Sequence, residues 1–333
     1  MRVLAGGLVL GGAVWLVCGL LLALARTAPP QGSSLLAISS IIDGPQPGVY
    51  LTLPDGDLRG RVNPPDTSAR RAIFADEGLV LYFDVHTLNG NRLWRYDLRT
   101  GARRDILAGH NLRLTGWNLS PDGRWLLLQQ YSRPESRIWR VPTAGDFDDA
   151  ALVLRAESGA LVLPTWSPDS AWLAYAEGIG TQRYVYRKLA VGGAPHRLAS
   201  HPDLMTNTPV AWSPEGDRLA YVTQNRGDAA IIVHQLPTDQ QTRYALPSTN
   251  SVIAWWPASP DWLYFLGRRS PRSISYFRLH LSTPAQPPQD LLWSPGGALG
   301  APGWLYFSSE NLSVQLPRGV YRMRPNGTDP ERV

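Results

Sequence analysis

Hydrophobic and polar residues alternate in this chain in a pattern that recurs several times in the same order. The clearest copy, residues 163–175, reads LPTWSPDSAWLAY: a short apolar stretch, a polar turn and a run of alternating bulky residues. Proline presets φ at the first corner of a tight turn, and Asp or Gly suits the positions that follow. An apolar residue before such a turn and an alternating run after it predict a β-hairpin.

The copies are evenly spaced along the chain. If the residue that opens the run after each turn is taken as an anchor, successive anchors lie 42 to 47 residues apart: Leu36, Val80, Trp125, Trp172, Arg218, Trp262 and Trp304. Six positions before each anchor stands an apolar residue, except that Pro30 precedes Leu36. A period in the forties with several short strands per copy indicates the blades of a β-propeller.

The predicted fold is therefore all-β, a propeller of four-stranded antiparallel sheets over residues 35–333. Seven copies favour seven blades, the first without its inner strand; six full blades with an extra N-terminal sheet are the alternative. Aromatic residues recur on the predicted inner strands, and we expect wedges packed between blades rather than a platform for stacking sugars: Phe74, Trp166, Trp212 and Trp256.

The N-terminal segment predicts export. Residues 3–25 carry no charge, and a helix of that length spans a bilayer's hydrocarbon core of about 30 Å. We expect a transmembrane anchor at residues 1–26 with the propeller extracytoplasmic, followed by a Pro/Gly/Ser spacer at residues 27–34. The alternative is a signal peptide cleaved after Ala23-Leu24-Ala25, which leaves a secreted or periplasmic protein.

Composition narrows the classes of function. Hydrophobic content of 44%, with 13 Trp and 13 Tyr, supports a buried core and excludes disorder. The net charge is +5, and nearly all the cations are arginines because Lys188 is the only lysine. No basic run alternates with aromatic residues, so we expect no binding of nucleic acid. The single cysteine, Cys18, excludes an intrachain disulfide.

Catalytic motifs are sparse. The sequence has no Gly-x-Ser-x-Gly elbow, and its six histidines are scattered without metal-ligand spacing. His201 and Asp203 lie in the longest connection between the middle copies, which makes them the candidates for the mouth of a central channel. A solvated loop is the other interpretation of this pair. We therefore expect no enzyme, no cofactor and no metal.

Arginines recur near the loops that join the second and third strands of the copies. Closing the predicted ring would gather these residues on one rim, which would attract an anionic partner. The alternative is that each arginine bonds to backbone carbonyls or to a local acid such as Glu135 or Asp228. The rim set comprises Arg92, Arg133, Arg137, Arg183, Arg226, Arg268, Arg269 and Arg272.

Residues 166–175 read WSPDSAWLAY, residues 212–221 read WSPEGDRLAY, and residues 320–330 read VYRMRPNGTDP. These three segments resemble the repeat of TolB-like (WD40-like) bacterial β-propellers. The resemblance covers residues 72–333 and implies a propeller fold. In this family such repeats serve as binding scaffolds and also as caps of enzymes.

Together these features predict an exported, membrane-tethered β-propeller that acts as a non-catalytic binding scaffold. The expected partner is an envelope protein or an acidic extracellular polymer. The alternative function is that of a propeller hydrolase or lyase, with its site at the channel mouth.

Overall fold

Most of the chain that can be described consists of β-strands and the turns between them. Helix in this part is limited to two short 3-10 segments, η1 (Asp76–Gly78) and η2 (Phe147–Asp149). The computed structural model describes residues 35–40, 46–53, 58–88, 90–132, 135–156, 161, 163–179, 182–205, 208–225, 228–246, 253–256, 259–270, 273–284, 286–291, 297–299, 305–308, 320–323 and 331–332.

The predicted anchor and spacer, residues 1–26 and 27–34, lie outside this described part. Within it, no helix combines the length and the apolar character needed to cross a membrane. The anchor and the location of the protein therefore stay predictions.

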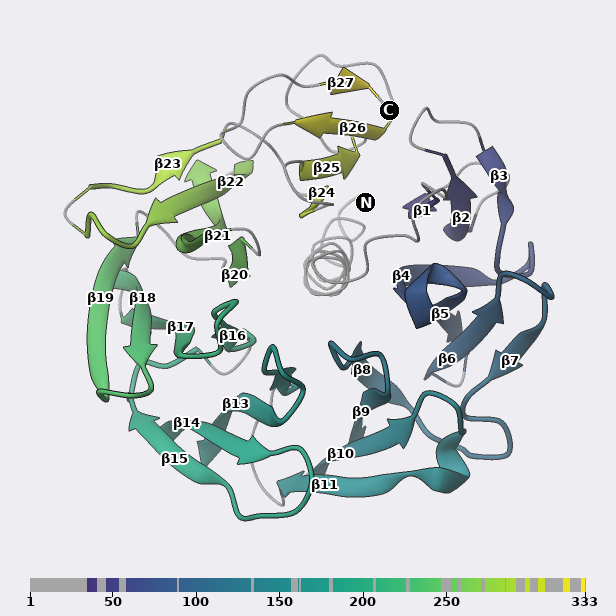
Figure 1. Ribbon diagram of the computed structural model, residues 1–333, viewed down its shortest axis with the longest axis horizontal. Helices are drawn as coiled ribbons and strands as arrows, with labels where there is room; N and C mark the ends of the chain where they lie inside the picture. Colours follow the sequence, from purple (N-terminus) through teal and green to yellow (C-terminus); the bar gives the residue numbers. More distant parts are fainter. Residues whose placement is uncertain are drawn as a thin grey trace, which may run out of the picture. The chain divides into compact units, whose positions relative to one another are not determined.

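The chain divides into two compact units, and each is described by itself. The central unit is Leu114–Trp293, and the terminal unit is Met1–Arg113 with Ser294–Val333. In both units, consecutive strands pair antiparallel within small sheets (Figure 1).

The central unit holds four groups of four consecutive strands, and the strands of each group pair antiparallel. Their strands are β8 (Leu114–Leu119), β9 (Trp125–Ser132), β10 (Glu135–Pro142) and β11 (Ala151–Ala156); β12 (Thr165–Trp166), β13 (Trp172–Ile179), β14 (Gln182–Leu189) and β15 (His196–Ser200); β16 (Ala211–Trp212), β17 (Arg218–Asn225), β18 (Asp228–Gln235) and β19 (Gln240–Leu246); and β20 (Ile253–Trp256), β21 (Ser259–Ser270), β22 (Ser273–His280) and β23 (Gln289–Asp290).

The terminal unit combines strands from both ends of the chain. Its first sheet has three described strands, β1 (Leu36–Ser40), β2 (Gly48–Thr52) and β3 (Leu58–Arg61). The other two have four each: β4 (Ser68–Ala75), β5 (Val80–Thr87), β6 (Gly90–Asp97) and β7 (Arg103–Asp105); and β24 (Gly297–Leu299), β25 (Leu305–Ser308), β26 (Val320–Met323) and β27 (Glu331–Arg332). The predicted four-stranded antiparallel repeat is confirmed, and the first copy shows three strands.

A serine explains why the sequence Ser-Pro-Asp recurs. Ser120, Ser167 and Ser213 are buried before the corner between the first two strands of their sheets. Each hydroxyl accepts a hydrogen bond from the N–H of the residue that opens the second strand, at 2.9, 2.8 and 2.9 Å respectively. The hydroxyl also donates to a carboxylate of the same turn, as from Ser213 Oγ to Asp217 Oδ1 at 2.8 Å. The turn therefore fixes where the second strand starts.

The corner also needs one residue with positive φ. Gly123 and Gly216 occupy this place with φ of 72° and 76°, and Ser170 occupies it in the β12–β15 sheet with φ of 61°. Glycine adopts this conformation without steric cost, whereas serine is strained there. The predicted corner at Pro168-Asp169 is confirmed, because the Ser170 N–H bonds to the Ser167 carbonyl at 3.0 Å.

Large apolar side chains fill the space between neighbouring sheets. Trp166 is 5% exposed and packs with Leu127 and Ile138 of the preceding sheet and with Leu173 and Tyr175 of its own. The predicted wedge is therefore confirmed for Trp166. Phe74 and Trp212 are only partly buried, and the side chain of Trp256 lies outside the described part.

Polar side chains on the first strands join one sheet to the next. Asn118 Nδ2 donates to the Pro164 carbonyl at 2.6 Å, and Thr165 Oγ1 donates to the Val210 carbonyl at 2.6 Å. In the opposite direction, Trp212 Nε1 donates to the Thr165 carbonyl at 3.1 Å. The bonds from Asn118 and Thr165 are buried, so each also satisfies a carbonyl that would otherwise be desolvated without a partner.

Candidate functional site

The loops between the second and third strands are the first candidate site. They connect β5 to β6, β9 to β10, β13 to β14, β17 to β18 and β21 to β22. Of the predicted rim residues, Arg133, Arg226 and Arg272 lie outside the described residues, and the side chains of Arg268 and Arg269 are not described. The structure describes the side chains of Arg92, Arg137 and Arg183.

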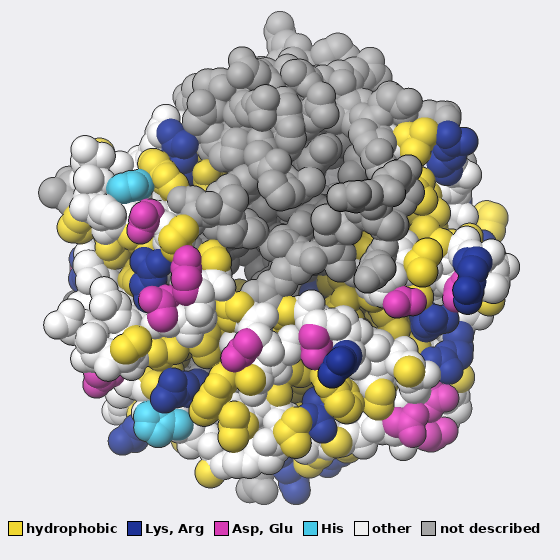
Figure 2. Space-filling model, in the orientation of Figure 1, with side chains coloured by type: hydrophobic (Ala, Val, Ile, Leu, Met, Phe, Trp, Pro, Cys, Tyr) yellow, Lys and Arg dark blue, Asp and Glu magenta, His cyan; other side chains and the backbone are white. Residues whose placement is uncertain are grey.

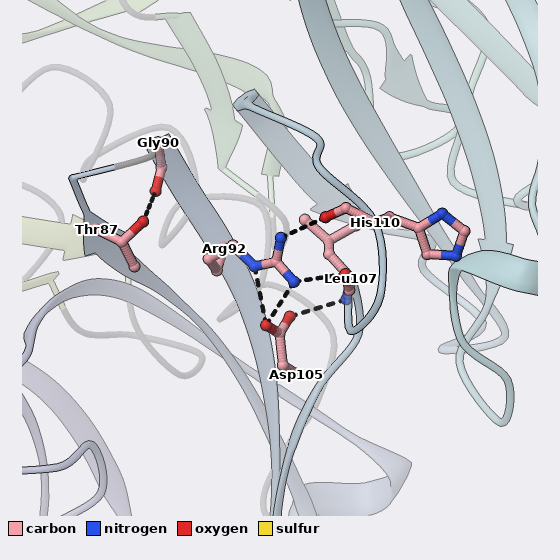
Figure 3. Close-up of polar contacts among 6 residues, drawn as sticks. All are labelled: Thr87, Gly90, Arg92, Asp105, Leu107 and His110. Carbon is pink, nitrogen blue, oxygen red and sulfur yellow. Dashed lines mark hydrogen bonds and ion pairs between the residues drawn. The ribbon is translucent and has the colours of Figure 1, made fainter.

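Arg92, on β6, bonds to groups of the nearby segment 105–110 (Figure 3). Its Nε donates to Asp105 Oδ2 at 2.9 Å, and its Nη2 lies 2.7 Å from the same oxygen. Its Nη1 donates to the His110 carbonyl at 2.7 Å, and its Nη2 donates to the Leu107 carbonyl at 2.5 Å. This guanidinium closes the loop after β7, and a ligand could bind it only by displacing these partners.

Arg137, on β10, pairs with Glu135 at the start of the same strand. Its Nε and Nη2 lie 2.9 and 2.8 Å from the two carboxylate oxygens, in a bidentate arrangement. Arg155 Nε of β11 contacts the same carboxylate. The hydrogen bond from Arg137 is the main reason that the pKa of Glu135 lies below its usual range. The cluster therefore exposes two guanidinium groups that share one carboxylate.

Arg183 lies near the start of β14, opposite Gly178, and is half-buried. Its carbonyl accepts a hydrogen bond from the His201 N–H at 3.1 Å. Arg268 pairs with Ile274 across the β21–β22 hairpin, and a register shift between Arg268 and Ser270 marks a β-bulge. Such a bulge redirects side chains and is frequent beside binding sites.

Neighbouring acids bear on the alternative interpretation of the arginines. Asp228, at the start of β18, bonds to Arg243 Nη2 at 2.7 Å. On the face shown in Figure 2, Lys and Arg side chains are interspersed with Asp and Glu among the coloured atoms. The described arginines thus include several that are paired with local acids.

His201 and Asp203, the second candidate pair, lie between β15 and β16 and bond to different partners. His201 Nε2 lies 3.1 Å from Tyr221 Oη and 3.2 Å from Gln241 Oε1, so it joins this connection to β17 and β19. Asp203 Oδ2 instead accepts from Asn225 Nδ2 at 3.1 Å. Burial is the main cause that lowers the pKa of His201, so the imidazole is neutral near pH 7.

A second histidine in this region was not singled out by the sequence. His234, on β18, is fully buried, and its Nε2 lies 2.6 Å from Asp239 Oδ1. Asp239 has a φ of 59°, in the left-handed region, and is exposed. Burial raises the pKa of Tyr221, and the Asp239 charge adds to the effect. A histidine inside the apolar run AAIIVH was the signal that could have found this cluster.

These polar groups do not form a metal centre. In the part of the chain that the structure describes, no three His, Cys, Asp or Glu residues are grouped so that they could hold a metal ion. His201 instead bonds to both Tyr221 and Gln241, from the connection between two sheets to the next sheet.

Comparisons with known proteins place this fold. No family model matches the chain. Human prolyl endopeptidase FAP is 25% identical over 187 residues, which cover 47% of this chain and 23% of that protein. The chain thus spans about a quarter of the curated relative that it matches.

Two solved structures are similar over most of the chain. Oligogalacturonate lyase from Vibrio parahaemolyticus has a TM-score of 0.67 at 13% identity, over 90% of this chain and 89% of that one. TolB from Acinetobacter baumannii has a TM-score of 0.54 at 14% identity, over 75% of this chain and 61% of that one. The protein is therefore a β-propeller with the TolB-like fold, as the sequence predicted.

Proposed function

We propose that this propeller is an exported, membrane-tethered binding scaffold whose partner is a protein or an acidic polymer of the cell envelope. The observation that carries the proposal is that many of its described polar side chains bond to other groups of the same protein. The Ser-Pro-Asp serines, Asn118 and Thr165 hold strands and sheets together. Arg92, His201 and Asp203 likewise bond within the framework.

This use of polar groups suits a rigid scaffold. A binding surface needs a fixed framework that presents loops, and those loops carry the specificity. Groups that bond to one another inside the framework are preorganised and lose little freedom when a partner binds. We therefore assign partner contacts to the loops between the second and third strands, and to the β21–β22 hairpin first.

The β21–β22 hairpin is favoured by its sequence and by its bulge. Arg268 and Arg269 are adjacent there, and the register shift falls between Arg268 and Ser270. Two neighbouring arginines provide positive charge and fork-shaped donors for carboxylates. An acidic protein segment or an acidic polysaccharide matches this chemistry.

The experiment is capture from envelope extracts by the full-length protein at low and high salt. Changing Arg268 and Arg269 together to Gln is expected to weaken capture several-fold at low salt, where screening is least. The matched control changes Arg99 and Arg124 to Gln, two exposed arginines outside these loops. Equal capture by both double variants would refute the assignment to this hairpin, and salt-independent capture would refute its electrostatic basis.

A second candidate function is that of a hydrolase or lyase, and one observation favours it. His201 is a half-buried, neutral imidazole whose Nε2 lies 3.1 Å from the Tyr221 hydroxyl. A neutral base beside a phenol is a usual arrangement for acid–base catalysis. The test is to incubate the protein with oligogalacturonate and with prolyl peptides, and to repeat any turnover with Tyr221→Phe. Turnover that this substitution abolishes would replace the scaffold proposal.

A further inference from the structure

Two cations from neighbouring sheets meet at one turn of the central unit. Lys188, the only lysine in the sequence, lies near the end of β14 and is 7% exposed. Its Nζ donates to the carbonyls of Leu189 and Gly192, at 3.2 and 2.5 Å. Arg140, on β10 of the preceding sheet, donates from Nη1 to the Ala190 carbonyl at 2.9 Å. Both cations therefore bind to carbonyls of the 189–192 turn.

The surroundings of this pair are apolar on one side. The Arg140 guanidinium lies 4.2 Å from the centroid of the Trp125 ring, and Ala190 packs in the core cluster that Trp125 borders. Within the described ranges, no carboxylate forms an ion pair with Lys188 or Arg140. Arg140 Nε is buried and lacks a hydrogen-bond partner there.

The charge of Arg140 acts on Lys188. Burial is the main cause that lowers the pKa of Lys188, and the Arg140 charge adds to it. Burial alone lowers the pKa of Arg140. Lys188 is buried, whereas Arg140 is partly exposed. Two like charges at one turn repel one another and the buried ammonium loses hydration, so an arrangement without a counter-charge is costly.

The turn carbonyls compensate only part of this cost. An ammonium has three N–H donors and a guanidinium has five, and the three carbonyls of the turn accept from the pair. Carbonyl dipoles carry no net charge, so the positive charge of the pair is not neutralised. An oxyanion supplies both the charge and further acceptors, and its geometry suits a guanidinium fork.

We propose that a small oxyanion, such as sulfate, phosphate or a free carboxylate, binds between the Lys188 ammonium and the Arg140 guanidinium. This site lies between the β8–β11 and β12–β15 sheets and is independent of the hairpin assigned to partner binding. A bound anion there would hold the two sheets together through the 189–192 turn.

The test is the thermal unfolding of the full-length protein in millimolar sulfate, at an ionic strength held constant with sodium chloride. The wild-type midpoint is expected to rise with sulfate and then saturate, because a ligand of the folded state stabilises it by mass action. Lys188→Met is expected to lose this rise and, without sulfate, to be at least as stable as the wild type. Equal responses of wild type and Lys188→Met would overturn the proposal.

Arg187→Met is the matched control. Arg187 also stacks on a tryptophan, 5.0 Å from the Trp172 centroid, and its Nε is likewise buried without a hydrogen-bond partner in the described part. Arg187 stacks on Trp172, which lies outside the 189–192 turn. This variant is therefore expected to keep the sulfate response. Loss of the response in Arg187→Met as well would show that the loss is not specific to Lys188 and would overturn the proposal.

A labelling measurement on the wild type avoids any folding defect of a variant. Lys188 carries the only side-chain amine in the chain, so its reaction with an amine reagent can be followed at one peptide by mass spectrometry. Sulfate is expected to slow this reaction several-fold, and an unchanged rate would contradict the site. Acetate distinguishes the anion: protection by acetate as well as sulfate indicates a carboxylate, and protection by sulfate alone indicates a tetrahedral ion.

Discussion

The β12–β15 and β16–β19 sheets have the same turn between their first two strands. The side-chain contacts of the residue that opens the second strand differ between them. In the first, Trp172 opens the second strand and Arg187 of the third strand stacks on its ring. In the second, Arg218 opens the strand and Val233 stands at the place of Arg187. Arg218 pairs instead with Glu215 and Asp217, at 3.6 and 3.4 Å.

The turn itself is unchanged between these two sheets. Ser167 and Ser213 accept from the opening residue at 2.8 and 2.9 Å, although that residue is Trp172 in one case and Arg218 in the other. The backbone bonds of the corner thus set the geometry, and the side chain at the anchor position is exchangeable. The β8–β11 and β20–β23 sheets have the same arginine–tryptophan contact as the β12–β15 sheet, with Arg140 over the Trp125 ring and Arg278 over the Trp262 ring.

The largest expected effect separates the wedge residues of the two sheets. Trp166→Ala should cost about 3–5 kcal/mol, because it empties a large buried site. Trp212→Ala should cost less, since Trp212 is only partly buried, although it also removes the hydrogen bond to Thr165. Urea unfolding followed by circular dichroism measures both. Equal losses would show that exposure does not distinguish the two positions.

The next effect tests what the two sheets share. Ser167→Ala and Ser213→Ala should each cost about 1–3 kcal/mol, because a buried N–H loses its acceptor. The two losses should agree closely, since the bonds are equivalent. A large difference in the free energy of unfolding would mean that the anchor side chain contributes to the turn after all.

A smaller effect tests what the two sheets do not share. Arg187→Met should remove a cation–π contact worth about 0.5–1 kcal/mol, with little dependence on salt. Arg218→Met should remove surface ion pairs worth about 0–1 kcal/mol, and this loss should vanish at high salt. Unfolding at two ionic strengths distinguishes them. The same salt dependence in both variants would contradict the comparison.

The smallest effect is a dependence on pH. The pKa of His201 lies below its ordinary value in the folded state, so the unfolded state binds the proton more readily. Stability is therefore full above about pH 6.5 and is lost as pH falls through the folded pKa. His201→Gln should flatten the decline of the unfolding midpoint in this range.

The pKa shift of Glu177, on β13, makes stability depend on pH in the opposite direction to that of His201. Glu177 therefore provides the internal comparison. Burial raises its pKa, so stability falls as pH rises from the ordinary carboxyl range through the folded pKa. Glu177→Gln should therefore stabilise the protein near neutral pH while leaving the acid-side decline due to His201 in place. A change of the acid-side decline in Glu177→Gln would show that the two groups are coupled.

The sequence was sufficient for features that depend on neighbours along the chain. The anchors Val80, Trp125, Trp172 and Arg218 open β5, β9, β13 and β17 as predicted. Alternation of side chains and turn chemistry are local, so they are visible without a structure. The role of the serine in Ser-Pro-Asp was missed, because proline and glycine alone account for a tight turn.

Features that depend on register and on contacts between sheets could not be predicted. For Arg92 the sequence offered bonds to backbone carbonyls or a local acid as the alternative to a rim, but it did not indicate which groups. The partners are Asp105 and the carbonyls of Leu107 and His110, which lie 13, 15 and 18 residues later in the chain. The meeting of Arg140 with the turn after Lys188 joins residues 50 positions apart. No local pattern encodes such pairs, because a shift of one residue in either strand would separate them.

The scaffold account is tested most directly by capture from envelope extracts with His201→Gln. The account assigns His201 to the framework, through its contacts with Tyr221 and Gln241. It predicts that the folded variant captures the same partners as the wild type, with the same yield at low salt. Loss of a captured partner or of a catalysed reaction, with the free energy of unfolding unchanged, would contradict the account and make this cluster the functional site.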